Sequence, residues 1–200
     1  DVDDVFLRRT ADFCDYFKTR LSEYHELVTG NVIYQHRTKN VGVIGTELIQ
    51  DYALSGPVLR AAGVAQDVRN DEPYGGYERF DFDVPIGERG GDCFDRHTVR
   101  MEEMVQSMRI IEQALACIPE GPIMAPKAPK RFRPPAGDYY FAVESARGHF
   151  GIFITSDGSD VPVRNKLRTP SFVNVSTMPI VLPGTMLADT VAVLGSIDIV

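Results

Sequence analysis

Two long segments carry an apolar stripe at helical spacing, and they limit how this chain can fold. In residues 3–28 and again in residues 92–118, large apolar side chains recur every three or four positions with charged residues between them. Gly30 follows the first segment and Pro119 follows the second, and both residue types end helices. The pattern predicts two long helices that pack together. The stripes contain Phe6, Phe13, Phe17, Leu21, Tyr24 and Val28 in the first segment and Phe94, Met101, Met104, Met108, Ile111, Leu115 and Ile118 in the second.

The remaining segments predict shorter elements. Residues 41–55 have the pattern of a short strand or turn with one helical turn, and residues 56–69 hold too much glycine and proline for a long helix. Phe80, Phe82 and Val84 alternate with aspartates, which predicts a strand. The C-terminal part predicts three strands and then two short helices, with the strands at 139–144, 150–155 and 162–168 and the helices at 171–178 and 186–195.

Together these elements predict an α+β fold, in which two long packed helices precede a small antiparallel or mixed C-terminal sheet. We expect residues 1–200 to form one domain or a large piece of one. A helical part with loop insertions spans residues 1–118, a proline-rich connector spans 119–137, and a strand-rich part spans 138–200.

The composition argues against several classes of function. A net charge of −7, a pI near 5.1 and the lack of a basic stripe argue against nucleic acid as a partner. Cys14, Cys93 and Cys117 form no CxxC pair, and no two histidines stand three or four residues apart, so we expect no metal site. The most apolar run, 191–197, is far shorter than the roughly 20 residues of a membrane-spanning helix. The chain starts with acidic residues where a signal peptide carries basic ones and stops within an apolar run, so we expect a fragment.

Arginines and acidic residues gather in the predicted loops and at the ends of elements. They are Arg60, Asp67, Arg69, Asp92, Asp95, Arg96, Arg100, Glu144, Arg147, Arg164, Lys166 and Arg168. Arginine pairs with carboxylates in a fixed bidentate geometry, and such pairs hold irregular backbone in place. We therefore predict structural ion pairs among Arg60, Asp67, Arg69, Asp95, Arg96, Glu144 and Arg147. The alternative is a buried arginine beside a redox centre, where its fixed charge would favour the reduced state.

Two acidic residues near the C-terminus leave alternatives open. Asp189 is expected to cap a short helix or to face water. Asp198 stands between Ile197 and Ile199, where a carboxylate must be paired, protonated or exposed to a cavity. A surface acid after a helix end is the other interpretation of Asp198.

Five blocks of the sequence, in this order, resemble the quinone-site subunit of the proton-pumping NADH:quinone oxidoreductase, respiratory complex I. They are 55-SGPVLRAAGVAQDVR-69, 72-EPYGGYERFDFDVPIGERGGDCFDR-96, 144-ESARGHFG-151, 167-LRTPSFVN-174 and 188-ADTVAVLGSID-198. The resemblance covers nearly all of the chain and corresponds to the C-terminal half of that subunit.

The block 144-ESARG-148 is also similar to a Glu-x-x-Arg-Gly block in the large subunits of nickel–iron hydrogenases, to which the quinone-site subunit is related. Hydrogenases hold their metal through two CxxC pairs, the second near the chain end, and this sequence has no cysteine after Cys117. The resemblance therefore implies a hydrogenase-like scaffold in which a cavity for a quinone head group replaces the metal.

The resemblance also implies the role of the chain in a quinone-reducing module. In this family, electrons leave NADH through a flavin and iron–sulfur clusters in other subunits and reach quinone beside the subunit with the last cluster. Val193, Asp198 and Val200 match residues that line the quinone and inhibitor pocket, whereas Glu144 and Arg147 match a mainly structural block that holds a glycine-bearing turn. The residues of the family that contact the head group lie in its N-terminal half. We therefore expect no catalytic residue, no bound cofactor and no activity in this chain alone.

The implied partners are the N-terminal half of the same subunit, the subunit with the terminal cluster and other complex I subunits. The implied location is peripheral, on the cytoplasmic side of a bacterial plasma membrane or the matrix side in mitochondria. The sequence departs from the family in two ways. The connector 119–137 is short, which affects subunit contacts, and the chain ends before the usual terminus, which leaves the pocket wall incomplete.

Two other hypotheses compete with this one. A metal-free hydrogenase-like scaffold or assembly module would only hold partners, and an effect of Asp198 on quinone reduction would argue against it. A hydrogenase fragment with its other cysteines upstream would contain nickel. In either case the apolar stripe of residues 6–28 needs a covering partner, so we predict large exposed apolar patches and poor behaviour as an isolated monomer.

Overall fold

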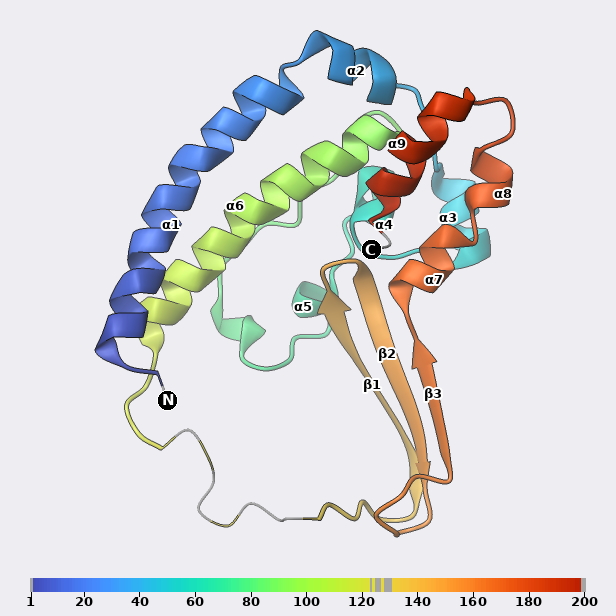
Figure 1. Ribbon diagram of the computed structural model, residues 1–200. Helices are drawn as coiled ribbons and strands as arrows, with labels where there is room; N and C mark the ends of the chain where they lie inside the picture. The colour runs from blue at the N-terminus through green and yellow to red at the C-terminus, as the bar shows by residue number, and fades with distance from the viewer. Residues whose placement is uncertain (1, 123, 125–126, 128–130, 199–200) are drawn as a thin grey trace.

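The computed structural model describes residues 2–122, 124, 127 and 131–198. Its two long helices are α1 (Asp4–Tyr24) and α6 (Cys93–Cys117), which lie side by side and run in opposite directions (Figure 1). Each helix begins at an aspartate whose side chain accepts a hydrogen bond from the N–H three residues later: Asp3 from Phe6 and Asp92 from Asp95, both at 2.7 Å. The α+β prediction and the two long helices are confirmed.

Short helices fill the segment between the long ones. A π-helical turn (His25–Thr29) continues α1 before Gly30, which extends the first long helix close to its predicted end. The others are α2 (Val32–Thr38), α3 (Thr46–Tyr52), α4 (Pro57–Ala61), α5 (Val68–Asp71) and the 3-10 turn η2 (Tyr77–Arg79). The prediction of no long helix in residues 56–69 is confirmed, whereas helix α2 was not predicted.

The sheet has three antiparallel strands in the order β1-β2-β3, and it extends away from the long helices (Figure 1). Strands β1 (Gly137–Ser145) and β2 (Gly148–Ser156) form a hairpin, and β3 (Arg164–Arg168) pairs with β2. Three helices follow it: α7 (Pro170–Val175), α8 (Met178–Val181) and α9 (Leu187–Ile197). The predicted sheet and the two predicted helical stretches are therefore confirmed.

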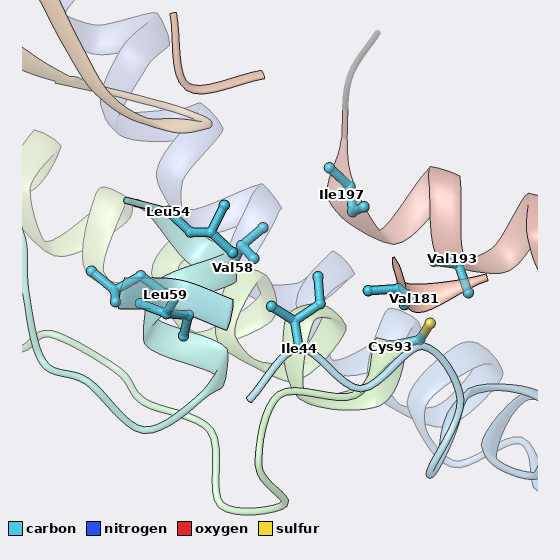
Figure 2. Close-up of a cluster of buried hydrophobic side chains, with 9 residues drawn as sticks. Ile44, Leu54, Val58, Leu59, Cys93, Val181, Val193 and Ile197 are labelled. Atoms are coloured by element: carbon cyan, nitrogen blue, oxygen red, sulfur yellow. The ribbon is translucent and has the colours of Figure 1, made fainter. Parts of the chain in front are cut away.

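The main apolar core lies where α9 meets the short helices α3 and α4 and the start of α6 (Figure 2). Val193 and Ile197 enter it from α9, and Cys93 enters it from the first turn of α6. The core also contains Ile44, Ile49, Leu54, Val58, Leu59 and Val181. This core fixes the C-terminal helix against the beginning of the longest helix, and the candidate site lies beside it.

The predicted strand at 80–84 is wrong. Residues 80–85 are extended but form no strand, because their backbone pairs with side chains of α6 and not with another strand. Gln113 accepts a hydrogen bond from the N–H of Asp81 at 2.9 Å and donates one to the Asp81 carbonyl at 2.7 Å. Gln106, two helical turns earlier, accepts from the N–H of Asp83 at 3.0 Å. The alternation of apolar and acidic side chains predicts an extended segment but does not show which groups form hydrogen bonds with its backbone.

Several large apolar side chains of the described chain are exposed. On α1 they include Val5, Phe6 and Phe13, and on the outer half of the sheet they include Tyr140 and Phe141. The described helices include none that combines the length and the apolar character of a membrane span. The poor behaviour expected of the isolated chain stays a prediction.

Candidate functional site

A buried arginine on α4 organises the region between the long helix and the hairpin. Arg60 is 2% exposed, and its guanidinium donates to Glu103 Oε1 on α6 at 2.6 Å and to Glu144 Oε1 on β1 at 2.9 Å. A third carboxylate, that of Asp67, lies 3.5 Å away. Burial alone would lower the pKa of Arg60, but the charges of Glu103, Glu144 and Asp67 outweigh it and raise that pKa. This arginine therefore stays charged and joins three elements.

Asp67 and Arg69 form the bidentate pair that arginine geometry favours. Arg69 Nε and Nη2 donate to the two carboxylate oxygens of Asp67 at 2.9 and 2.6 Å. Burial raises the pKa of Glu144, Arg60 offsets part of that effect, and Asp67 adds to it. Glu144 also accepts a hydrogen bond from the N–H of Val68 at 3.3 Å, which fixes the start of α5 to β1.

Asp95 and Arg96 hold loop backbone and, among the described residues, form no ion pair with each other. Asp95 Oδ2 accepts the N–H groups of Arg89 and Gly91 at 2.8 and 3.0 Å. Arg96 is fully buried and donates to the carbonyls of Gly91 and Gly42 at 2.6 and 2.8 Å. Neighbouring residues on a helix point about 100° apart, so each side chain reaches a different part of the loop.

Arg96 also connects α6 to α9. Its Nε donates to Ser196 Oγ at 2.9 Å, and one Nη2 hydrogen points to Cys93 Sγ at 3.2 Å. Burial lowers the pKa of Arg96, and the neighbouring groups only partly offset this. The predicted structural role of Arg96 is thus exerted through neutral partners.

Glu144 lies near the end of β1 and Arg147 lies in the hairpin turn, and they bind different partners. Glu144 pairs with Arg60, whereas Arg147 Nε donates to the backbone carbonyl of Asp198 at 2.6 Å. The Asp198 carboxylate lies 3.8 Å from the same nitrogen. The turn thus joins the buried arginine cluster on one side to the end of α9 on the other.

The glycine of this turn permits a close approach of two backbones. Gly148 has φ +124°, and a Cβ on it would lie 2.7 Å from both the Ser55 carbonyl carbon and the Gly56 nitrogen. Gly56 has φ +70° and meets Gly148 from the other side. The glycine-bearing turn therefore packs directly on the backbone that begins α4, and so determines where Arg60 meets Glu144.

Two cavities adjoin at Arg100, Met104 and Asp198, which line both. The first, here called the polar cavity, has a volume of about 290 Å³ and is otherwise lined by Arg60, Arg69, Glu103, Ser107, Glu144 and Ser145, among others. The second, the apolar cavity, has a volume of about 450 Å³ and is lined by residues of α2, α6 and α9. These include Tyr34, His97, Met101, Val191, Ala192 and Gly195.

The ring of His97 in the apolar cavity is held neutral. Its Nε2 lies 3.0 Å from Thr29 Oγ1, and its ring meets Tyr34 edge-on at 5.1 Å between centroids. Burial lowers the pKa of His97, and the charges of His25 and Arg100 lower it further. Apart from Arg100, Asp198 and two hydroxyl side chains, the lining of this cavity is aromatic, aliphatic or sulfur-containing.

Asp198 ends α9 at the boundary of the two cavities. It has left-handed backbone angles, φ 57° and ψ 62°, and its N–H donates to the Gly195 carbonyl at 3.1 Å. Its side chain is 41% exposed, so the carboxylate faces open space and is not buried between its apolar neighbours. Of the interpretations left open by the sequence, a residue buried between its apolar neighbours is excluded. Asp198 ends the helix, lines both cavities and lies beside Arg147.

The other predicted pocket residues lie elsewhere. Val193 is 0% exposed in the apolar core and is absent from the lining of both cavities, whereas Val200 lies outside the described residues. Asp189 is buried and pairs with Arg37 of α2 at 2.5 Å, so it neither caps α9 nor faces water. Sequence reasoning missed Tyr34, because α2 was not predicted, and it assigned Met104 only to the helix seam.

The described residues include no cluster of histidine, cysteine and carboxylate side chains able to hold a metal ion. The family model for the respiratory-chain NADH dehydrogenase 49 Kd subunit matches residues 1–133 and residues 126–200. The chain therefore belongs to this family of respiratory-chain subunits, and the resemblance drawn from the five sequence blocks is confirmed.

Its relatives are named as subunits of NADH-quinone oxidoreductase. The protein from Desulforamulus reducens is 51% identical over 200 residues, which is all of this chain and 54% of the relative. Those from Syntrophobacter fumaroxidans and Geobacillus kaustophilus are each 48% identical over all of this chain, which covers 53% and 54% of them. The chain thus spans about half the length of the curated relatives it matches.

Proposed function

We propose that this chain is part of the quinone-reducing module of an NADH:quinone oxidoreductase, and that the end of α9 forms one wall of its quinone pocket. The observation that supports this most directly is the position of Asp198. An acid at the end of α9 stands between an apolar cavity and a polar one, with Arg147 beside it. The relatives are named for NADH-quinone oxidoreductase, and that name identifies the kind of substrate.

The apolar cavity suits a quinone head group in size and in lining. Ligand pockets commonly measure about 300–1,000 Å³ and combine apolar walls with a few polar groups. The cavity of about 450 Å³ lies within that range, and its walls are Tyr34, the neutral His97 and methionines of α6. Asp198 adds a partly exposed carboxylate that lines both cavities. Reduction of a quinone requires protons as well as electrons, so an acid at this boundary is useful there.

Two more residues of this chain are assigned to the same wall, and partner subunits would supply the rest of the site. Val193 supports the wall by fixing α9 in the core, and Val200 is assigned to the same wall by resemblance alone. We assign no catalytic role to Val193, Asp198 or Val200, and we assign no bound cofactor to this chain. Electrons would arrive from the terminal iron–sulfur cluster of a partner subunit. The remaining half of the subunit and other complex I subunits would complete the pocket on the cytoplasmic side of a bacterial membrane or the matrix side in mitochondria.

The alternative is a metal-free hydrogenase-like scaffold or assembly module. The surroundings of Arg60 favour it, because three carboxylates from distant segments meet there in an arrangement that holds backbone together. The two functions differ in what they require of Asp198, because only the quinone pocket needs its carboxylate.

The test uses the complete complex in its native membrane with Asp198→Asn. NADH oxidation is measured with quinone and, separately, with an artificial acceptor that takes electrons upstream of quinone. We expect quinone reduction or inhibitor sensitivity to change while the upstream reaction is kept. Asp51→Asn is the matched control, because Asp51 is an exposed carboxylate outside both cavities. If both reactions of the assembled Asp198→Asn complex equal those of the control, this part of the chain is scaffold.

A further inference from the structure

Arg100, which is partly buried, differs from the other arginines of the site. Arg60 and Arg69 each meet a carboxylate, and Arg96 uses its nitrogens on two carbonyls, a hydroxyl and a thiol. Arg100 donates from Nη1 to the carbonyl of Arg96 at 3.1 Å, and its Nε is buried with no hydrogen-bond partner. Within the described part of the chain Arg100 forms no ion pair. A buried donor without an acceptor is costly, so an unmet donor calls for a partner.

The position of Arg100 indicates where such a partner would lie. The residue belongs to both cavities, on the same boundary as Asp198 and Met104. On the polar side, acceptors are already present in Glu103 and Glu144, and both of these bind Arg60. The oxygen-bearing side chains of the apolar lining are those of Asp198, Tyr34, Thr38 and Ser196, and within the described residues none of them accepts a hydrogen bond from Arg100. The unmet donor capacity of Arg100 is therefore best satisfied by an oxygen atom of a molecule in the apolar cavity.

The local charges favour an oxygen that carries negative charge. Burial lowers the pKa of Arg100, the carboxylates of Asp198 and Glu103 oppose this, and the cations Arg96 and Arg60 add to it. A guanidinium that forms no ion pair with the carboxylates near it gains more from an anionic ligand than from a neutral one. Arg60, with three carboxylates around it, has no such requirement.

We propose that Arg100 binds a ring oxygen of the quinone head group in the apolar cavity and that it holds this oxygen most strongly when the oxygen is negatively charged. The inference rests on the proposed function and adds to it a residue that binds the negatively charged form of the substrate. A quinone becomes a quinol by taking two electrons, here from the partner subunit's iron–sulfur cluster, and two protons, here from water. Negative charge develops on the ring oxygens between electron and proton uptake, and a fixed guanidinium stabilises that stage.

The test uses two probes on the complete, purified complex. A 2-hydroxynaphthoquinone is ionised at neutral pH, whereas the matched 2-methoxynaphthoquinone stays neutral. Inhibition of quinone reduction by each probe is compared in wild type, Arg100→Gln and Arg100→Lys. Arg109→Gln is the control, because Arg109 lies on the same helix but binds Asp81 and Asp83 at the surface, away from both cavities.

We expect Arg100→Gln to weaken inhibition by the ionised probe about tenfold or more, since a hydrogen bond to a charged group is lost. Inhibition by the neutral probe should change by less than about threefold, and Arg100→Lys should restore most of the preference because it keeps the charge. The upstream reaction should be unchanged in every variant. Equal weakening of both probes, or no change in either, overturns the proposal.

A second variant keeps the inference testable if Arg100→Gln does not assemble. Asp198→Asn removes a negative charge that competes for Arg100, so it should strengthen inhibition by the ionised probe relative to the neutral one. An unchanged ratio between the probes overturns the role of Arg100. If quinone reduction and both inhibitions are also unchanged, the proposed pocket fails as well, so the two failures are distinguishable.

Discussion

Two arginines that line the polar cavity have contrasting surroundings. Arg60 is surrounded by Glu103, Glu144 and Asp67, and its hydrogen bonds join α4 to α6 and β1. Arg100, one helical turn before Glu103 on the same side of α6, retains an unsatisfied nitrogen. The same side chain thus holds backbone together where carboxylates surround it and is available to a ligand where they do not. The number of neighbouring acceptors separates a structural arginine from a binding one.

The largest expected effect comes from replacing each arginine by methionine in the complete complex. Arg60→Met leaves buried carboxylates without their cation, and such a loss typically costs about 3–5 kcal/mol. We expect a large fall in the thermal unfolding midpoint of the subunit, or loss of assembly. Arg100→Met removes a cation that has no paired charge, so its midpoint should stay close to that of wild type. Similar falls for both variants would contradict the comparison.

A smaller effect is expected from Gly148→Ala, which changes the turn between the two arginine environments. An alanine there has φ +124° and places its Cβ against the backbone of Ser55 and Gly56. Strained backbone of this kind costs about 1–3 kcal/mol, and the displaced hairpin would move Glu144 away from Arg60. Thermal unfolding measures the loss. Gly158→Ala is the matched control, because it also has positive φ but an added Cβ meets no atom there. Equal losses in both variants would show that the contact with Gly56 is unimportant.

The smallest expected effect is a dependence of stability on pH through Glu144. Its pKa is raised in the folded protein from an ordinary value of 4.5, because burial disfavours the charged form. Between the unfolded-state pKa and the higher folded-state pKa, the folded state binds more protons than the unfolded state. The free energy of unfolding therefore falls as pH rises through this range. The slope is at most about 1.4 kcal/mol per pH unit. Unfolding midpoints of wild type and Glu144→Gln, measured from pH 4 upward in roughly half-unit steps, test this.

Wild type and the Glu144→Gln variant should differ in how steeply their stability falls as pH rises. Glu144→Gln cannot titrate, so its stability should decline less than that of wild type over the same range. A wild-type protein that gains stability relative to the variant as pH rises would mean that Arg60 outweighs burial. In that case the pKa of Glu144 lies below its ordinary value.

Much of the secondary structure could be predicted from local patterns. The stripes of α1 and α6 and the alternation in β1 and β2 repeat within a few residues, so a single sequence shows them. The strand expected at residues 80–84 failed because its backbone pairs with Gln106 and Gln113 of α6. Helix α2 was missed because it has only seven residues, and so short a segment shows little periodicity.

The candidate site was only partly predictable, and for one reason. The sequence identified Arg60, Glu144 and Arg147 as residues that need partners, but residues as far apart as Arg60 and Glu144, or Arg147 and Asp198, meet only in the folded chain. Asp95 and Arg96 show the converse, because both were expected to form ion pairs and both bind loop backbone in the folded chain.

The sequence by itself determined the two long helices, the strands of the sheet and the membership of the family, since all of these depend on local spacing or on extended similarity. Only the tertiary structure decided which arginine is neutralised, where Asp198 lies and that two cavities meet beside it. Ion pairing and cavities depend on distances between segments far apart in the chain. Those distances follow from how α9, the hairpin and α6 pack around one core, and no local pattern encodes them.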